Sequence, residues 1–108
     1  MGKYTIRITD DAVDNLTEIR NYIANTLFAP ETALNYIRSI RNEISRLSDF
    51  PSGIKPVDDE PWHSLGIRRI LAKNFFVYYR IDEQSKTVFV LNILYARRDQ
   101  LPLLEKLT

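Results

Sequence analysis

The stretch GIRRILAKNFFVYYRIDEQSKTVFVLNILYARRD, residues 66–99, decides the fold. It contains three runs rich in β-branched and aromatic residues, a composition typical of β-strands. These runs lie at 67–73, 75–82 and 87–96. A tight turn near Lys73–Asn74 is expected to join the first two runs, and the polar segment DEQSK (82–86) is expected to form a hairpin turn before the third. Because connections this short cannot join parallel strands, the three strands are predicted to pair antiparallel.

Two amphipathic helices are predicted upstream of these strands. Apolar residues recur at spacings of three and four in each segment, which places them on one helical face. They are Ala12, Leu16, Ile19 and Ile23 in the first helix, and Ala33, Ile37, Ile40, Ile44 and Leu47 in the second. Thr9 or Asp10 is expected to cap the first helix, and Pro30 is expected to begin the second. The very short connection predicts an antiparallel helical hairpin over about residues 10–48.

The remaining segments complete the expected architecture. Alternation over residues 4–9 predicts a short N-terminal strand, and residues 49–66, with three prolines and two glycines, are predicted to form a loop. The segment LPLLEKL after Asp99 is predicted to form a short C-terminal helix. We therefore expect one α+β domain over residues 1–108, in the order β-α-α-β-β-β, with a helical hairpin packed on one face of a small antiparallel sheet.

Composition excludes several classes of protein. Fifteen Lys and Arg residues face 14 Asp and Glu, so the net charge of +1 does not by itself indicate nucleic-acid binding. The chain has no cysteine and one histidine, which excludes disulfides, cysteine-ligated zinc and a histidine cluster for a metal. No apolar run is long enough for a membrane helix. We expect a soluble cytoplasmic protein that needs no metal or cofactor.

Positive charge is concentrated in one part of the sequence. Four basic residues and no acid lie between Glu60 and Asp82, and the pair Arg97–Arg98 follows the last strand. The four are Arg68, Arg69, Lys73 and Arg80. Strict alternation predicts one face for Val77, Tyr79 and Ile81, and likewise one face for Phe89, Leu91, Ile93 and Tyr95.

Two interpretations of this pattern stay open. Basic and aromatic side chains together on an open sheet face suit RNA, because cations hold phosphates and rings stack on bases. Alternatively, the arginines lie at the rim of a half-buried sheet with their aliphatic stems packed against it. His63 is interpreted either as an ordinary loop residue or as a general acid or base in an RNA-cleaving site. The acidic run at 58–60 is interpreted as a solvated loop edge.

The whole-chain pattern resembles the RelE/ParE superfamily of type II toxin–antitoxin toxins. The likeness rests on DNLTEIRNYI, LSDFPSG, GIRRILAKNFFVYYRID and VFVLNILYARRDQLPLL, in this order. The resemblance implies a toxin that is neutralised by a cognate antitoxin, with which it could form a hetero-oligomer. It also implies one of two activities, which are metal-independent cleavage of mRNA in the ribosomal A site, as in RelE-like members, or poisoning of DNA gyrase, as in ParE-like members.

Three features favour the ParE-like branch. The helices are long, the ending ILYARRD is similar to that of ParE toxins, and Leu103 stands where the RelE catalytic tyrosine is expected. The arginine of RelE on the penultimate strand falls at or near Phe76, which is also chemically silent. Our favoured hypothesis is a non-enzymatic toxin that arrests growth by binding DNA gyrase. The alternatives are a ribosome-dependent mRNA endonuclease and a non-toxic member that only binds its antitoxin.

The resemblance and the local charge pattern suggest three sets of functional residues. The predicted target-binding residues are Arg97, Arg98, Asp99, Tyr95 and Arg80. The predicted antitoxin-binding residues are Arg68, Arg69, Tyr79 and Leu103. If the chain is an endonuclease, the candidates are Arg97 for phosphate stabilisation, Lys73 or Arg69 for substrate charge, and Tyr95 or His63 for proton transfer.

Overall fold

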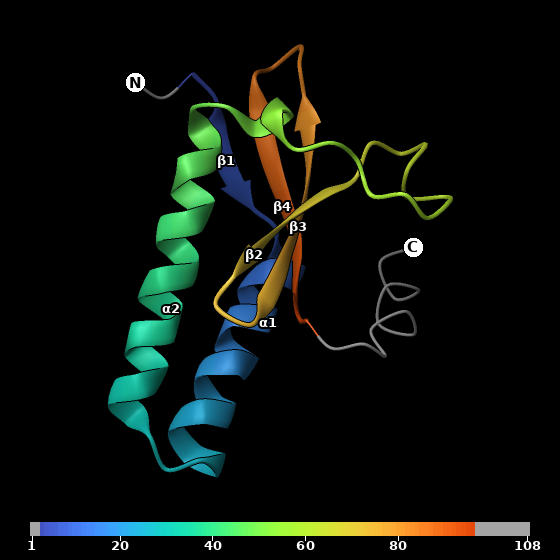
Figure 1. Ribbon diagram of the computed structural model, residues 1–108. Coiled ribbons are helices and arrows are strands. Elements are labelled where there is room, and N and C mark those ends of the chain that lie inside the picture. The colour runs from blue at the N-terminus through green and yellow to red at the C-terminus, as the bar shows by residue number, and fades with distance from the viewer. Residues whose placement is uncertain (1–2, 97–108) are drawn as a thin grey trace.

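The computed structural model describes residues 3–96 and shows a helical hairpin packed on one face of a sheet (Figure 1). The elements are β1 (Thr5–Ile8), α1 (Asp10–Asn21), α2 (Pro30–Ser45), β2 (Arg68–Ala72), β3 (Phe75–Asp82) and β4 (Thr87–Tyr95). A π-helical turn, η1 (Tyr22–Thr26), extends α1, and two 3₁₀ turns, η2 (Arg46–Ser48) and η3 (Pro51–Gly53), follow α2. The predicted α+β class and order of elements are confirmed. The predicted C-terminal helix lies outside the described residues.

The sheet is mixed, with the strand order β1-β4-β3-β2. The last three strands pair antiparallel as predicted, but β1 pairs with β4 in parallel, with Ile8 opposite Val90. The prediction of a wholly antiparallel sheet is therefore wrong for β1. The rule about short connections applies only to the last three strands, whereas the whole helical hairpin separates β1 from the rest and leaves its direction free.

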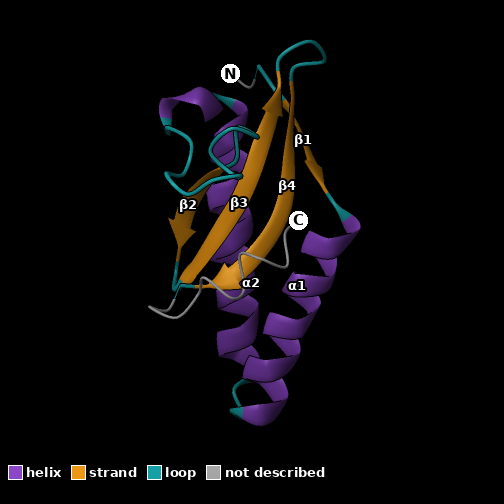
Figure 2. Ribbon diagram, turned by 90° about the vertical axis from the view of Figure 1, so that its right-hand side faces the viewer, coloured by secondary structure: helices purple, strands orange, loops and turns teal. Residues whose placement is uncertain are grey.

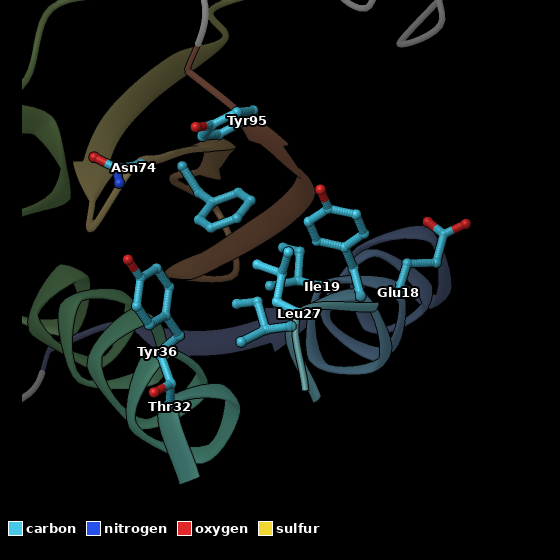
Figure 3. A pocket seen from close by; sticks show the side chains of 10 residues that line it. Glu18, Ile19, Leu27, Thr32, Tyr36, Asn74 and Tyr95 are labelled. Atoms are coloured by element: carbon cyan, nitrogen blue, oxygen red, sulfur yellow. The ribbon is translucent and has the colours of Figure 1, made fainter. Parts of the chain in front are cut away.

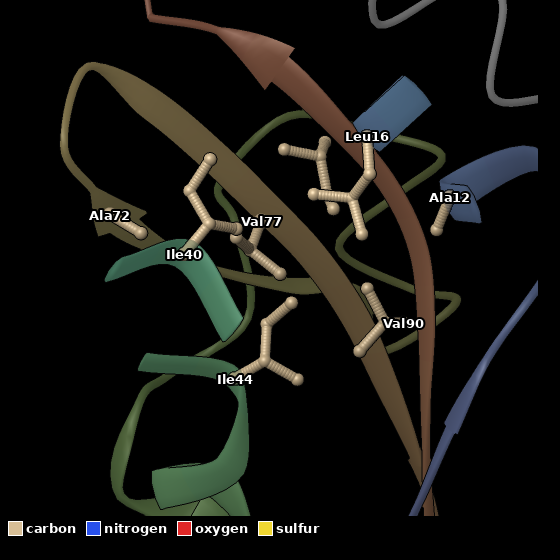
Figure 4. Packing of buried hydrophobic residues seen from close by; sticks show 8 residues of the cluster. Ala12, Leu16, Ile40, Ile44, Ala72, Val77 and Val90 are labelled. Carbon is tan, nitrogen blue, oxygen red and sulfur yellow. The ribbon is translucent and has the colours of Figure 1, made fainter. Parts of the chain in front are cut away.

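The predicted apolar stripes of both helices form the main core (Figure 4). Ala12 and Leu16 of α1 and Ile40 and Ile44 of α2 are buried against the sheet. The sheet contributes Ala72, Val77, Val90 and Ile93. Two helices and a sheet each have one apolar side, and packing them together removes all of these side chains from water.

Thr9 fixes the start of α1 against the sheet. Its Oγ1 accepts a hydrogen bond from the backbone N–H of Ala12 at 3.3 Å, which is the expected N-cap. The same hydroxyl donates to the carbonyl oxygen of Val90 in β4 at 2.9 Å. At the other helix, Pro30 occupies the first turn of α2, as predicted.

A β-bulge interrupts the alternation of β4. Tyr78 pairs with Asn92 but Tyr79 pairs with Val90, so Leu91 has no partner in β3. Val90 and Ile93 consequently both face the helices, while Leu91 packs on the opposite side. The predicted shared face for the residues of the last strand is therefore wrong beyond the bulge, since one extra residue reverses the phase of all that follow.

Asn15 of α1 stabilises the backbone next to the bulge. Its Oδ1 accepts hydrogen bonds from the backbone N–H of Ile93 at 2.9 Å and from Nδ2 of Asn92 at 3.1 Å. β1 pairs with β4 only as far as Val90, so it gives no acceptor to the backbone N–H of Ile93. The side chain of Asn15 accepts this hydrogen bond instead.

The loop that follows α2 covers part of the other face of the sheet. Trp62 and Ile67 are buried there together with Tyr78 of β3. Val57 of the loop and Phe76, Leu91 and Leu94 of the sheet pack around them. The sheet is thus covered on both faces near its centre, by the hairpin on one side and by this loop on the other.

Candidate functional site

The predicted functional residues lie in separate parts of the structure. Arg80 pairs across the sheet with Phe89, whereas Phe75 pairs with Tyr95. These two pairs lie six positions apart along β4, a distance of about 20 Å. Arg80 and Tyr95, two of the predicted target-binding residues, therefore lie at opposite ends of the sheet. The others, Arg97, Arg98 and Asp99, lie outside the described residues, as does Leu103.

Arg69 forms a cation–aromatic cluster at the edge of the loop-covered face. Its guanidinium carbon lies 4.0 Å from the centre of the Phe76 ring, and its Nη1 donates to the hydroxyl of Tyr78 at 3.4 Å. Burial raises the pKa of Tyr78, an effect that Arg69 partly opposes. A phenol with a raised pKa is not a general base at neutral pH. This cluster holds the arginine in place without supplying proton transfer.

Tyr79 and Arg68, two predicted antitoxin contacts, belong to the other side of the sheet. Tyr79 has no exposed surface, and its hydroxyl donates to the carbonyl oxygen of Pro51 at 2.8 Å. Burial raises its pKa to about 12. The prediction of Tyr79 as a partner contact is therefore wrong, because its side chain is enclosed beneath η2 and η3 and offers no surface. Arg68 is half-buried, and its Nε donates to the carbonyl oxygen of Ile54 at 2.6 Å.

A second cation–aromatic pair lies near the β3–β4 turn. Arg80 is exposed, and its guanidinium carbon is 4.5 Å from the centre of the Phe89 ring. Arg7 of β1 pairs with the same Phe89 from the other side and is also exposed. Within residues 3–96, neither arginine forms an ion pair. Arg7 was missed by the sequence analysis, although the alternation of the first strand places it on the face opposite the helices.

Tyr95 lines a pocket between the helical hairpin and one end of the sheet (Figure 3), and Lys73 lies near Tyr36, another lining residue. The pocket has a volume of about 420 Å³ and a mostly apolar lining. Its aromatic residues are Tyr22, Tyr36, Phe75 and Tyr95. Lys73 occupies a left-handed position in the β2–β3 turn, with φ of 57°, and its Nζ lies 5.4 Å from the centre of the Tyr36 ring.

The helical residues of this pocket were not among the predicted site residues. Tyr36 precedes Ile40 by four positions, so it lies on the flank of the apolar stripe of α2. Its ring meets that of Phe75 edge-on at 6.4 Å, and Phe75 in turn lies 5.4 Å from Tyr95. The spacing of Tyr36 from Ile40 was the available signal for this wall of the pocket.

His63 is engaged within its own loop. Its Nδ1 lies 2.9 Å from the carbonyl oxygen of Val57, so this nitrogen carries the proton and donates. Its ring is exposed, and the hydrogen bond joins two parts of the loop that covers Tyr78. In the part of the chain that is described, no group of three His, Asp or Glu residues is placed to hold a metal ion, and no helix is long and apolar enough to cross a membrane.

The chain is similar to a known protein family and to several solved structures. The profile of the family described as "ParE toxin of type II toxin-antitoxin system, parDE" matches residues 6–100. No curated protein sequence matches the chain. The chromosomal ParDE toxin–antitoxin system of P. aeruginosa gives a TM-score of 0.73 at 20% identity, covering 88% of this chain and 98% of that one.

Two further solved structures share the fold. One is the RelBE2 toxin–antitoxin complex of Mycobacterium tuberculosis, with a TM-score of 0.59 and 23% identity over 90% of this chain and 97% of that one. The other is a mutant of the E. coli toxin RelE in the free state, with a TM-score of 0.62 and 10% identity over the whole of both chains.

The hairpin-on-sheet fold is shared with the ParDE and RelE structures, as the resemblance predicted. Because the family profile covers nearly all of the sequence, the chain belongs to the ParE toxin family of type II toxin–antitoxin systems.

Proposed function

We propose that this chain arrests growth by binding DNA gyrase and does no chemistry of its own. The observation that supports this function is the dispersal of the candidate catalytic groups over separate elements. Arg69 is held by Phe76 and Tyr78, Lys73 lies beside Tyr36 in a turn, and His63 bonds to its own loop. General acid–base catalysis needs groups within hydrogen-bond reach of one reacting centre, which this distribution does not favour.

Arg97 and Arg98 are the residues that we propose for target inhibition. The test is expression of the chain without its antitoxin, with growth as the readout. Arg97→Ala combined with Arg98→Ala is expected to relieve growth arrest. The matched control, Arg38→Ala with Arg41→Ala, removes the same charge from the exposed face of α2 and is expected to leave arrest intact. Unchanged toxicity of the first double variant would remove these arginines from the mechanism.

A supercoiling assay with purified gyrase identifies the target. The same preparation of the chain is added to a gyrase reaction and to an in-vitro translation reaction. Inhibition of supercoiling with normal translation is the expected result. Normal supercoiling with blocked translation would contradict the gyrase proposal and favour the ribosome.

The partner that neutralises the chain is proposed to be a cognate antitoxin. The ParDE and RelBE2 structures of similar fold are toxin–antitoxin systems, which supports such a partner. A disordered antitoxin segment that folds on binding could cover the exposed apolar and cationic side chains of this chain and form a hetero-oligomer with it. Both this neutralisation and the proposed action on gyrase would take place in the cytoplasm.

A ribosome-dependent mRNA endonuclease is the second candidate function. The pairs Arg69–Phe76 and Arg80–Phe89 favour it, because guanidinium groups and rings side by side suit a phosphate backbone and its bases. Primer extension on translated mRNA tests this function. Discrete cuts in the A site at saturating toxin would establish it, and their absence would exclude it. A member that only binds its antitoxin would not arrest growth when it is expressed alone.

A further inference from the structure

The tip of the helical hairpin is unusually apolar for an exposed surface. We define the tip segment as residues 21–30, NYIANTLFAP, which contains no charged residue although 27% of the chain is charged. Figure 2 shows α1 and α2 extending past the end of the strands, so this segment projects from the molecule. Tyr22, Leu27 and Phe28 are 57%, 54% and 87% exposed. Charge depletion together with exposed aromatic residues is typical of the centre of a protein interface.

The backbone of the tip segment is strained as well as exposed. Phe28 has φ of 53°, in the left-handed region that a bulky residue rarely adopts. The preceding turn, η1, is π-helical, a geometry that often occurs at functional sites. Glycine or asparagine would relieve the strain at position 28. At 87% exposure, the Phe28 ring has little contact with its own chain that would offset this strain.

Part of the aromatic pocket is formed by the tip segment itself. Leu27, the neighbour of Phe28, lines it together with Tyr22 from the same segment (Figure 3). An apolar protein cavity of about 150 Å³ accepts benzene. The pocket, at about 420 Å³, is therefore large enough for a phenyl ring.

We propose that two copies of this chain associate through their hairpin tips, with Phe28 of each copy inserted into the aromatic pocket of the other. The tip segment supplies both a projecting ring, Phe28, and two walls of a pocket large enough for a ring, Tyr22 and Leu27. A two-fold axis brings both into contact at once, so each interaction is made twice. Because residues 21–30 contain no charged side chain, two copies of this segment can meet without repulsion between like charges.

The area available sets the strength of this association. The exposed parts of Tyr22, Leu27 and Phe28 amount to roughly 400 Å² per copy. With the pocket walls added, the two copies together bury roughly 1,000 Å², which is below the range of stable specific interfaces and within that of weak, transient ones. Such an area is expected to give a weak dimer with a Kd of about 10–100 µM.

Sedimentation velocity of the full chain tests this proposal. From about 5 to 500 µM, which brackets the expected Kd, the weight-average mass should rise from that of a monomer towards that of a dimer. Phe28→Asn keeps a residue that tolerates positive φ and removes the ring, and it should weaken association at least tenfold. The matched control is Phe50→Asn, because Phe50 is also exposed, at 72%, but follows the opposite end of α2.

Cross-linking gives a second, geometric readout. The chain has no cysteine, so single cysteines can be introduced cleanly. Asn74 lines the pocket, and a mixture of Phe28→Cys and Asn74→Cys chains should form a disulfide-linked heterodimer (Figure 3). The control mixture of Phe50→Cys and Asn74→Cys should do so at least tenfold more slowly.

Three results would overturn the proposal. They are a chain that stays monomeric up to about 500 µM, a dimer that Phe28→Asn leaves as strong as Phe50→Asn does, and equal rates of cross-linking in the two mixtures. Because none of these measurements involves gyrase, the ribosome or an antitoxin, the self-association stands or fails separately from the proposed function.

Discussion

Replacing Ile40 by alanine tests the packing of the hairpin on the sheet. Ile40 of α2 has no exposed surface and belongs to the cluster that joins both helices to β2, β3 and β4. Removing its outer carbon atoms leaves a cavity that the surrounding backbone cannot fill, because two layers of regular structure enclose it.

The magnitude follows from this complete burial. Truncation of a buried isoleucine to alanine costs about 2–5 kcal/mol, and the better helix propensity of alanine returns only a few tenths of a kcal/mol. The net loss is expected at about 2–4 kcal/mol, a large part of the roughly 5–15 kcal/mol that stabilises a domain. Leu34→Ala on the same helix is the control, since Leu34 is 51% exposed and its truncation should cost under about 1 kcal/mol.

Equilibrium unfolding in denaturant, followed by circular dichroism, measures both variants. The midpoint is expected to fall for Ile40→Ala with an unchanged dependence on denaturant, which marks a change in stability alone. A loss below about 1 kcal/mol, or one equal to that of Leu34→Ala, would refute the helix phase and the layer packing described here.

Two further predictions concern polar groups of the core. Asn15→Ala leaves the amide of Ile93 without an acceptor and should cost about 1–3 kcal/mol of stability. Asn15→Asp keeps the acceptor and should recover most of this loss. Equal stability of both variants and the wild type in denaturant would contradict this role of Asn15. The pKa of Tyr79 is raised from 10.0 to about 12 by burial, so the folded state favours the neutral phenol and stability should decline as pH rises from 10 towards 12. Tyr79→Phe should show a shallower decline over this window in thermal unfolding, and an identical pH dependence would show that Tyr79 does not cause it.

Local pattern predicted most of the fold. The spacing of Ile40 and Ile44 predicted the buried face of α2, and the short connections predicted the antiparallel pairing of β2, β3 and β4. The direction of β1 could not be predicted, because no short connection joins it to another strand and its pairing therefore has no local constraint. The bulge at Leu91 was also out of reach, because an unpaired residue changes the ladder without changing the alternation in the sequence.

The candidate site was less accessible to sequence reasoning. A strand alternates between two faces, but the sequence does not say what covers each of them. Tyr79 was predicted as an antitoxin contact, but the turns that follow α2 cover its side chain, and no local pattern in the strand indicates this. The contact of Arg69 with Phe76 depends on the register across the two-residue turn between β2 and β3. The pairing of Arg7 with Phe89 depends on the parallel alignment of β1 with β4.

The parallel pairing of β1 with β4 has a consequence during synthesis on the ribosome. The first strand to emerge has no neighbour in the sheet until β4, the last, has been made, since β4 lies between β1 and β3. The closure of so long a segment is slow and entropically costly, so the hairpins of β2, β3 and β4 are expected to assemble before β1 docks. A translation product interrupted before Thr87 would lack the strand that joins β1 to β3, and such a fragment could not adopt the complete architecture.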